Sequence, residues 1–335
     1  MTTTQSNTVQ IIQNGARLNA AKADVLGQPV VVTGRRLKMA AIEDEIWLEG
    51  ELIKDPAAFV SALKASGLKF DWFTFAQKFT DIKPHYRYHY DWDNMAAIPL
   101  NGWEEWWEKR VSHDLRKDVK RSEKRGLVVK SAPFDDDFVR GISGIYNEAR
   151  VRQGRHFWHY GKDFAAVKAE NSTFIERSEF VGAYVESELV GFIKLVYTDG
   201  AARMMQILSK EAHQDKRPTN ALIAKAVEIA CERGCTYLTY GKYTYDNKKN
   251  SSIVQFKRRN GFEEILFPRY AIPFTAKGKA AIAAGLHLGI KRLIPEWLMY
   301  RLLDARAKVR AWRNPEAAPA RVADAGEPEA AVSNE

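Results

Sequence analysis

Residues 180–209 read FVGAYVESELVGFIKLVYTDGAARMMQILS and decide the fold class. Three runs in this stretch are rich in β-branched and aromatic residues, as strands are, and they occupy residues 180–186, 189–198 and 202–209. Asp199-Gly200 favours a tight hairpin turn between the second run and the third. The stretch therefore predicts an antiparallel meander of three strands.

The chain that follows the meander predicts alternating helices and strands. Lys216-Arg217-Pro218 leads into a helix over residues 219–232, whose apolar residues recur at helical spacing until Gly234. Further along, we expect a strand at 236–241, a short helix at 250–262 that closes on Asn260-Gly261, and a final pair of strands at 263–267 and 270–274. This order predicts an α+β fold with one central mixed sheet and flanking helices.

The chain before the meander predicts a smaller unit and several helices. Residues 1–25 are polar and indicate a loose arm, and residues 26–102 carry the signals of a small α+β unit. Helices are expected at 103–125, 135–152 and 162–172, with an aromatic and charged loop at 152–161 that has the character of a ligand-binding segment.

The helix at 103–125 is strongly basic. Two neighbouring flanks carry its cations, Lys109, Arg116, Lys120 and Lys124 on one and Arg110, Lys117, Arg121 and Arg125 on the other. Such a run is either a solvated helix face or a cradle for phosphates, to which guanidinium groups bind well. The net charge of +9 favours an anionic partner in the same general way.

Composition excludes several classes of protein. A hydrophobic content of 45% supports a folded core. No apolar run is long enough to span a membrane, and the first ten residues lack the pattern of a signal peptide, so a cytoplasmic location is expected. The two cysteines, Cys231 and Cys235, do not frame a disulfide-rich fold and are expected to be buried. No Cys, His or acidic cluster has metal-ligand spacing, so no metal is expected.

The C-terminal region predicts two basic amphipathic helices and a tail. Residues 276–313 form the helices, which dock on the protein, make a dimer or lie on a membrane surface; docking is the default expectation. Residues 314–335 are rich in Ala, Pro and Glu and indicate a disordered tail. The predicted organisation is thus an arm, a small unit, a main domain over 103–275, the helices and the tail.

Residues 203–262 resemble the GNAT acyltransferases and, more closely, their Fem-like (FemAB-like) relatives, which attach acyl or aminoacyl groups to amines. In place of the glycine-rich RxxGxG loop of GNAT enzymes, the chain has Lys216-Arg217-Pro218-Thr219-Asn220 at the start of a helix. Phe256-Lys257 looks like the Fem-type motif whose lysine lies near the acyl-transfer centre, and residues 116–126 resemble the helix before the second GNAT-like domain of those proteins. The resemblance covers about residues 100–275 and implies that residues 26–102 are a reduced first GNAT-like domain.

Acyl transfer to an amine requires an oriented acceptor, a stabilised oxyanion and a place for the leaving group. Candidate catalytic residues are Lys257, Tyr243, His159 and Glu148. The resemblance implies donor-binding roles at the start of the helix, for Lys216, Arg217, Thr219 and Asn220, together with Phe256. Acceptor contacts are expected from the aromatic loop and the end of the strand at 236–241: Arg152, Gln153, Arg155, Tyr160, Tyr240 and Lys242.

Three functions remain open from the sequence. The first is an N-acyltransferase that takes an acyl group from acyl-CoA to a primary amine of a small or cell-envelope-related metabolite. The second is Fem-type transfer from aminoacyl-tRNA to an amine like that of a peptidoglycan precursor. The third is a non-catalytic basic module that binds RNA or a membrane; the absence of the glycine-rich loop favours it, and Phe256-Lys257 argues against it.

Overall fold

The computed structural model describes residues 7–13, 16–50, 52–152, 154–245, 248–289 and 301. The chain forms two compact units. The first contains the described residues up to Met95 and those from Ile265 to residue 289; the second contains residues Ala96 to Glu264, with Arg301. Among the described residues, no helix has the length and apolar character needed to cross a membrane.

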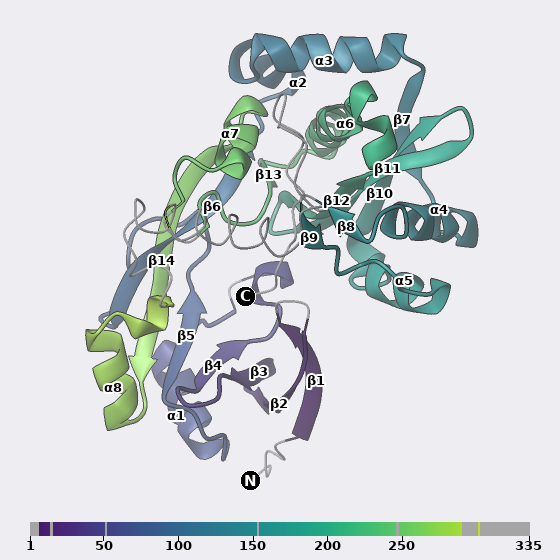
Figure 1. Cartoon of the computed structure of the whole chain (residues 1–335). Coiled ribbons are helices and arrows are strands. Elements are labelled where there is room, and N and C mark those ends of the chain that lie inside the picture. The colour runs from purple at the N-terminus through teal and green to yellow at the C-terminus, as the bar shows by residue number, and fades with distance from the viewer. Residues whose placement is uncertain are drawn as a thin grey trace. The chain divides into compact units, whose positions relative to one another are not determined.

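The first unit is a sheet with one main helix on each face (Figure 1). Its strands are β1 (Asn7–Gln13), β2 (Ala16–Val25), β3 (Gln28–Thr33), β4 (Met39–Ile42), β5 (Trp72–Ala76) and β14 (Glu263–Pro273), in that spatial order. Its helices are the short η1 (Glu45–Trp47) and η5 (Leu286–Leu288), α1 (Pro56–Ala65) and α8 (Ala276–Ala283). Phe59 and Leu63 of α1 pack on one side of the sheet, and Ala281 and Ile282 of α8 pack with Trp72.

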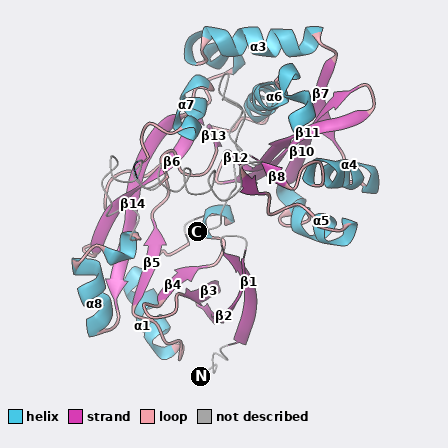
Figure 2. Ribbon diagram, in the orientation of Figure 1, coloured by secondary structure: helices cyan, strands magenta, loops and turns pink. Residues whose placement is uncertain are grey.

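The second unit is also built on a mixed sheet, with more helices around it (Figure 2). Its strands are β6 (His89–Pro99), β13 (Tyr237–Thr239), β12 (Ala201–Ser209), β11 (Glu188–Thr198), β10 (Ser178–Val185) and β7 (Leu127–Ala132), in spatial order, with the small pair β8 (Val151–Arg152) and β9 (Arg155–His156). Its helices are α2 (Trp103–Glu105), η2 (Trp106–Arg110), α3 (His113–Lys124), α4 (Asp136–Tyr146), α5 (Phe164–Asn171), η3 (Ile175–Arg177), η4 (Glu211–Lys216), α6 (Pro218–Glu232) and α7 (Ser252–Arg259).

The core of the second unit lies on both faces of this sheet. Successive strand residues point to opposite faces, and on β11 Ile193 packs with Leu222 of α6 while Phe192 packs with Ile142 of α4. The sheet is therefore a central layer between α3 and α6 on one side and α4 and α5 on the other.

The two units share one connectivity. In the first, β1 to β4 form an antiparallel meander, α1 crosses over to β5, which lies parallel to β4, and β14 pairs antiparallel with β5. In the second, β7, β10, β11 and β12 form the meander, α6 crosses over to the parallel β13, and β6 pairs antiparallel with β13. The structure thus confirms the predicted α+β fold with a smaller unit of the same type before it.

The closing strands of the two units are exchanged along the chain. Strand β14 follows the sequence of the second unit and completes the sheet of the first, whereas β6 follows the sequence of the first and completes the second. Residues 265–275, expected within the main domain, therefore lie in the first unit.

Several predicted elements differ from the structure. Residues 7–13 and 16–25, expected as part of a loose arm, form β1 and β2, and the expected strand pair at 263–267 and 270–274 is the single strand β14. The helix expected at 103–125 is interrupted at Val111, whose backbone is extended, so that a π-helical turn precedes α3. The helix expected at 135–152 ends at Tyr146. Residues 290–300 and 302–335, which include most of the predicted C-terminal helices and the tail, lie outside the described residues.

We expect Gly278→Ala to destabilise the first unit. A Cβ at Gly278 in α8 would lie 1.9 Å from the backbone oxygen of Asp71, and backbone atoms cannot rotate away as a side chain can. Overpacking of this kind lowers the free energy of unfolding by about 1–3 kcal/mol, measured by urea denaturation. The matched control is Gly144→Ala in α4, where the nearest atom is the flexible Lys210 Nζ at 3.8 Å. Better helix propensity should raise stability there by up to about 1 kcal/mol, and equal effects at the two glycines would contradict the packing.

Candidate active site

The parallel pair β12 and β13 diverges. Their register joins only Ala201 to Tyr237, Ala202 to Leu238 and Arg203 to Thr239, after which β13 ends. Strand β12 continues for six residues to Ser209 and pairs over that length with β11 alone. In the first unit, β4 ends one residue beyond its parallel register with β5 and leaves no comparable opening. The second unit is therefore the one in which the sheet separates along its middle.

A β-bulge lies in the diverging part of β12. Lys194 of β11 is opposite Gln206 and Leu195 is opposite Met204, so Met205 has no partner residue on β11. Bulges bend a strand, leave the extra residue outside the regular ladder and are frequent beside active sites. The bulge thus adds irregular backbone to the opening between the strands.

The crossover helices of the two units differ at their N-termini. Helix α1 begins after Asp55, whose carboxylate accepts hydrogen bonds from the backbone N–H groups of Ala57 and Ala58, each at 3.0 Å. Helix α6 begins after Arg217, which has a left-handed backbone (φ 52°) and provides no side-chain cap, and the first turn of α6 contains no acidic residue. Because a helix N-terminus attracts anions, α1 already holds its own carboxylate, whereas α6 presents a positive end between Lys216 and Asn220.

Four predicted donor-binding residues surround this end of α6. Lys216 and Arg217 are partly exposed and form long ion pairs, Lys216 with Asp215 at 3.5 Å and Arg217 with Asp118 at 3.8 Å. Thr219 is buried, with its hydroxyl 3.2 Å from that of Ser209 at the end of β12, and Asn220 is half-buried. The start of α6, which follows the two cations, therefore lies against the end of the diverging strand through the Thr219–Ser209 contact.

Lys257 of α7 is a buried cation. Its side chain is 1% exposed, and its Nζ donates a hydrogen bond to the backbone carbonyl of Lys242. Nζ also lies 4.8 Å from the ring centre of Tyr240 and 4.9 Å from that of Tyr245. Among the described residues, no carboxylate forms an ion pair with it. Tyr240 and Lys242 directly follow β13, so the structure joins three of the predicted site residues at the end of that strand.

Burial lowers the pKa of Lys257 from 10.5 to about 7, because the ammonium group loses its hydration. At neutral pH this amine therefore exists in both protonation states. Such a group can stabilise developing negative charge as a cation, and it can give up a proton at little cost.

The other residues predicted near Lys257 are packed in the core. Phe256 is buried in the main hydrophobic cluster of the second unit, and Tyr243 is half-buried against it. Burial raises the pKa of the Tyr243 hydroxyl, so Tyr243 stays protonated at neutral pH.

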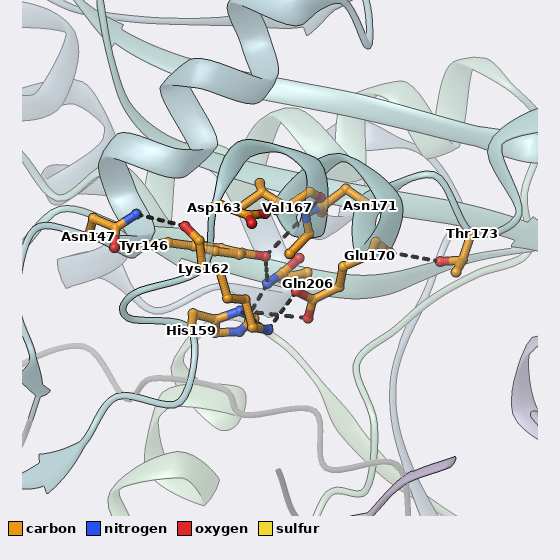
Figure 3. Close-up of polar contacts among 11 residues, drawn as sticks. Tyr146, Asn147, His159, Lys162, Asp163, Val167, Glu170, Asn171, Thr173 and Gln206 are labelled. Atoms are coloured by element: carbon orange, nitrogen blue, oxygen red, sulfur yellow. Dashed lines mark hydrogen bonds and ion pairs between the residues drawn. The ribbon is translucent and has the colours of Figure 1, made fainter. Parts of the chain in front are cut away.

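His159 lies in a second polar cluster, between α4, α5 and β12 (Figure 3). Its Nε2 is 3.3 Å from the Gln206 amide nitrogen, which also donates to the Tyr146 hydroxyl at 2.6 Å. Its Nδ1 is 3.3 Å from Lys162 Nζ, and Lys162 pairs with Glu170 at 2.6 Å. The ring packs closely, in a tilted arrangement, against the rings of Trp158 and Tyr146. The cluster fixes His159 rather than leaving it open to a ligand.

Burial makes His159, a predicted catalytic residue, a poor general base. An exposed histidine titrates near neutrality, but loss of hydration lowers the pKa of His159 from 6.5 to about 4. The imidazole is therefore neutral at pH 7 and a weak base. A structural role, in which it orients Gln206 on the diverging strand, fits this environment better than catalysis.

Glu148 and Arg152 form a structural pair. Both Glu148 oxygens accept backbone hydrogen bonds from the start of η4, at 2.7 Å from Glu211 and 2.9 Å from Ala212, and Arg152 is 3.2 Å away. The Arg152 side chain is 5% exposed and donates to the carbonyl groups of Ile145 and Ser209. With its lone pairs engaged, Glu148 holds the loop before α6 in place and is poorly suited as a general base.

The remaining predicted residues lie at the edge of this region. Tyr160 is 40% exposed and available to a ligand. Arg155 lies in β9, whose pairing partner is β8, and Gln153 lies outside the described residues. Of the cysteines, Cys235 is buried as expected but Cys231 is only partly so. Burial raises the pKa of both thiols, which makes neither a ready nucleophile.

Lys194 is a second buried lysine, and it is not among the site residues predicted from the sequence. It is 1% exposed, and its Nζ donates to the carbonyl groups of Asn171 and Thr173, at 2.9 and 2.5 Å. A lysine inside the apolar run 189–198 was the available signal, because an interior strand position tolerates a cation only where acceptors meet it.

The basic helix α3 keeps part of its charge exposed. Arg116 is engaged, since it donates to the carbonyl groups of Trp107 and Glu108, each at 2.8 Å. The exposed basic residues are Lys117, Lys120, Arg121, Lys124 and Arg125. Arg121 and Arg125 have acidic neighbours at 3.7 and 3.6 Å. Both interpretations of this surface, solvated and phosphate-binding, remain compatible with this geometry.

This architecture, with its mixed sheet, crossover helix and separating parallel strands, is the GNAT-like acyltransferase fold. The structure is similar to that of FemX, with a TM-score of 0.51 and 11% sequence identity over 84% of this chain and 91% of that one. It is also similar to L-PGS from Bacillus licheniformis, with a TM-score of 0.50 and 15% identity over 86% of this chain and 89% of that one. Both similarities span both units of the chain.

Sequence comparison adds no relative: no protein-family model matches the chain, and no curated protein matches it. The structural similarities, at these identities, define the fold.

We expect the stability of the protein to fall in acid partly through His159. Between pH 6.5 and about 4, the unfolded chain binds a proton at this residue and the folded chain does not, so the free energy of unfolding falls as pH falls through this window. The loss reaches up to about 3 kcal/mol, at about 1.4 kcal/mol per pKa unit. His159→Phe should flatten this part of the stability profile in urea titrations. His113→Gln, at an exposed histidine of α3, should leave it unchanged; equal profiles for wild type and His159→Phe would contradict a buried neutral imidazole.

We expect Lys257→Met to stabilise the fold. The unfolded chain holds a proton at Lys257 between pH 7 and 10.5 that the folded chain has released, so burial of this amine costs stability at neutral pH. Replacement by an apolar side chain of similar length should raise the free energy of unfolding at pH 7 by about 1–3 kcal/mol. Lys120→Met, on the exposed face of α3, should change it by less than about 0.5 kcal/mol. A marked loss of stability in Lys257→Met would identify the lysine as a structural group.

Proposed function

We propose that the protein is an N-acyltransferase that transfers an acyl group from acyl-CoA to a primary amine of a small or cell-envelope-related metabolite. The observation that carries the proposal is the buried Lys257 at the end of β13, where the sheet opens beside β12. A buried cation without a carboxylate partner among the described residues is costly to the fold, and such costs are retained where function requires them.

The donor site that we propose is the positive end of α6. The pyrophosphate of CoA would meet the uncapped start of the helix, with Lys216 and Arg217 beside it. The GNAT glycine-rich loop lets the backbone wrap the pyrophosphate. In this chain Lys216 and Arg217 occupy the corresponding position, and Arg217 has a left-handed backbone conformation. The acyl thioester would then extend between the diverging strands toward Lys257.

The chemistry is aminolysis of a thioester. The neutral acceptor amine attacks the carbonyl carbon, the new C–N bond forms, and the C–S bond breaks as the amine proton passes to solvent. Protonated Lys257 would stabilise the oxyanion and the departing thiolate. Lys242 and Tyr160 are the acceptor contacts that we retain, because Tyr240 is only 2% exposed and packs in the core. Tyr243 is the retained candidate for proton donation to the leaving group.

A second donor is aminoacyl-tRNA, and one observation favours it. The exposed cations of α3, with Lys117, Lys120 and Lys124 among them, form a basic face on the second unit. A nucleic acid would bind such a face through its phosphates. The reaction at Lys257 would be the same in kind, with an ester in place of the thioester.

Thermal stability of the purified protein distinguishes the donors. Acetyl-CoA, a long-chain acyl-CoA, free CoA and deacylated tRNA are titrated separately, because a ligand that binds the folded state raises Tm in a saturable way. We expect a CoA species to raise Tm and Arg217→Ala to reduce this shift. Lys120→Met is the matched control, which should keep the CoA shift and would weaken any tRNA shift. No response to any CoA, with salt-sensitive tRNA binding, would replace the first donor with the second.

The pH dependence of the reaction tests Lys257. Since its pKa is about 7, the protonated form disappears as pH rises, and kcat/KM with the donor so identified should decline above that pH. Lys257→Arg should lose this decline because arginine stays protonated, and Lys257→Met should lose at least about 100-fold in kcat, a typical loss for a stabilising group. Lys194→Met, at the other buried lysine, should retain activity. Normal activity of Lys257→Met would remove the lysine from the mechanism.

A further inference from the structure

We propose that the first unit contains a binding site for a transition-metal dication such as Zn²⁺, formed by His89, Asp91 and His287. The three side chains each place one ligand atom within 4.8 Å of the others. The boundary between the units falls within β6, after Met95, so all three residues belong to the first unit, and the site does not depend on the proposed acyl transfer in the second.

Strand geometry places two of the ligands together. His89 and Asp91 are two residues apart on β6, and residues i and i+2 of a strand point to the same face. His89 Nε2 is 3.2 Å from Asp91 Oδ2. A histidine and a carboxylate so arranged form a ready pair of donor atoms on a rigid strand.

The third ligand comes from a distant part of the sequence. His287 lies in η5, 196 residues after Asp91, and its Nε2 is 2.6 Å from the same Asp91 Oδ2. The rings of His89 and His287 are 5.3 Å apart and nearly perpendicular. Asp91 thus lies between two imidazole nitrogens, a long-range arrangement that sequence spacing does not reveal.

The environment of His287 supports a cation more than a simple ion pair. Its side chain is only 7% exposed, so the Nε2 that faces Asp91 has little access to water. His89 and His287 both direct Nε2 at the same Asp91 oxygen, so one carboxylate oxygen meets two imidazole nitrogens. A dication at the shared position would bind one nitrogen of each ring together with the carboxylate.

The donor set selects the class of metal. Two imidazoles and one carboxylate suit Zn²⁺ and other late first-row dications, whereas Mg²⁺ and Ca²⁺ prefer oxygen donors throughout. Bonds of about 2.0–2.1 Å place tetrahedral ligand atoms roughly 3.3 Å apart. The 3.2 Å between Asp91 Oδ2 and His89 Nε2 already matches this spacing. The 2.6 Å between Asp91 Oδ2 and His287 Nε2 would lengthen to it with a small side-chain rotation. Because His89 is 47% exposed, the remaining coordination positions face water.

Metal binding to the full-length protein without an affinity tag tests the site. After treatment with a chelator, the protein is titrated with Zn²⁺ by calorimetry and with Co²⁺ by visible absorption, which reports the geometry of the bound ion. We expect one ion per chain, absorption bands of a four- or five-coordinate Co²⁺ centre, and a rise in Tm with Zn²⁺. Asp91→Asn, which keeps the size of the side chain, should abolish all three.

The matched control is His85→Gln. His85 and Asp81 also form a His–Asp pair, at 2.6 Å, without a third ligand among the described residues. This variant should bind Zn²⁺ as the wild type does. Binding that is equal in the wild type and Asp91→Asn, or its absence from the wild type, would overturn the proposal and leave an ion pair between β6 and η5.

Discussion

Strands β12 and β13 are joined by three residue pairs and then separate, and the candidate active site depends on this divergence. The pairing of β13 with β12 ends at Thr239, whereas Tyr240 and Gly241 still form backbone hydrogen bonds with Ala96 of β6, and the Lys242 carbonyl accepts a hydrogen bond from Lys257. Strand β12 continues through its bulge to Ser209, and η4 then leads to the start of α6. The donor end and the reactive end of the proposed site thus both lie beside the point where the parallel pairing of β12 and β13 stops. The flanking layers keep the opening in shape: α6 packs on one face, and the α4 and α5 cluster fixes Gln206 through Tyr146 and His159 on β12 itself.

Because the two units share one connectivity, the features that belong to the proposed site can be compared with the same positions in the first unit. Both units have a meander, a crossover helix and a parallel strand, and they differ at the two places where a donor would bind. In the first unit β4 is short and Asp55 caps α1; in the second unit β12 is long and α6 begins at Arg217 without a side-chain cap. The N-terminus of α1 is therefore neutralised by a carboxylate, whereas the N-terminus of α6, at the corresponding position of the same connectivity, keeps its positive charge. Each unit is completed by a strand from the other part of the sequence, β14 in the first unit and β6 in the second.

The sequence predicted the elements whose signals are local. The meander, α6 and its boundaries, and the hairpin at Asp199-Gly200 follow from residue patterns within a few turns of chain. The prediction of a loose arm was wrong for residues 7–13 and 16–25, because these residues are strands through their pairing rather than through a pattern of apolar alternation. The break at Val111 likewise leaves no mark in the periodicity of the sequence. At the site, the Phe256-Lys257 motif was predicted from the sequence, but burial of the lysine, the neutral state of His159 and the hydrogen bonds that Glu148 accepts from η4 depend on neighbours that are distant in the sequence. Charge and residue type in the sequence indicate which residues are candidates for the site. Their protonation state and availability depend on desolvation and hydrogen-bond partners, which the sequence alone does not give.

Amide hydrogen exchange of the full-length protein, with and without the donor that stabilises it, tests the central claim most directly. If the donor lies along the divergence, exchange should slow at the start of α6, over residues 216–221, and along the diverging part of β12, over residues 204–209. The segment after β13 that holds Tyr240 and Lys242 should slow with them, and the start of α1 should stay unchanged because Asp55 already occupies it. Protection at α1, or protection confined to the basic face of α3 with none along β12 and α6, would contradict the account.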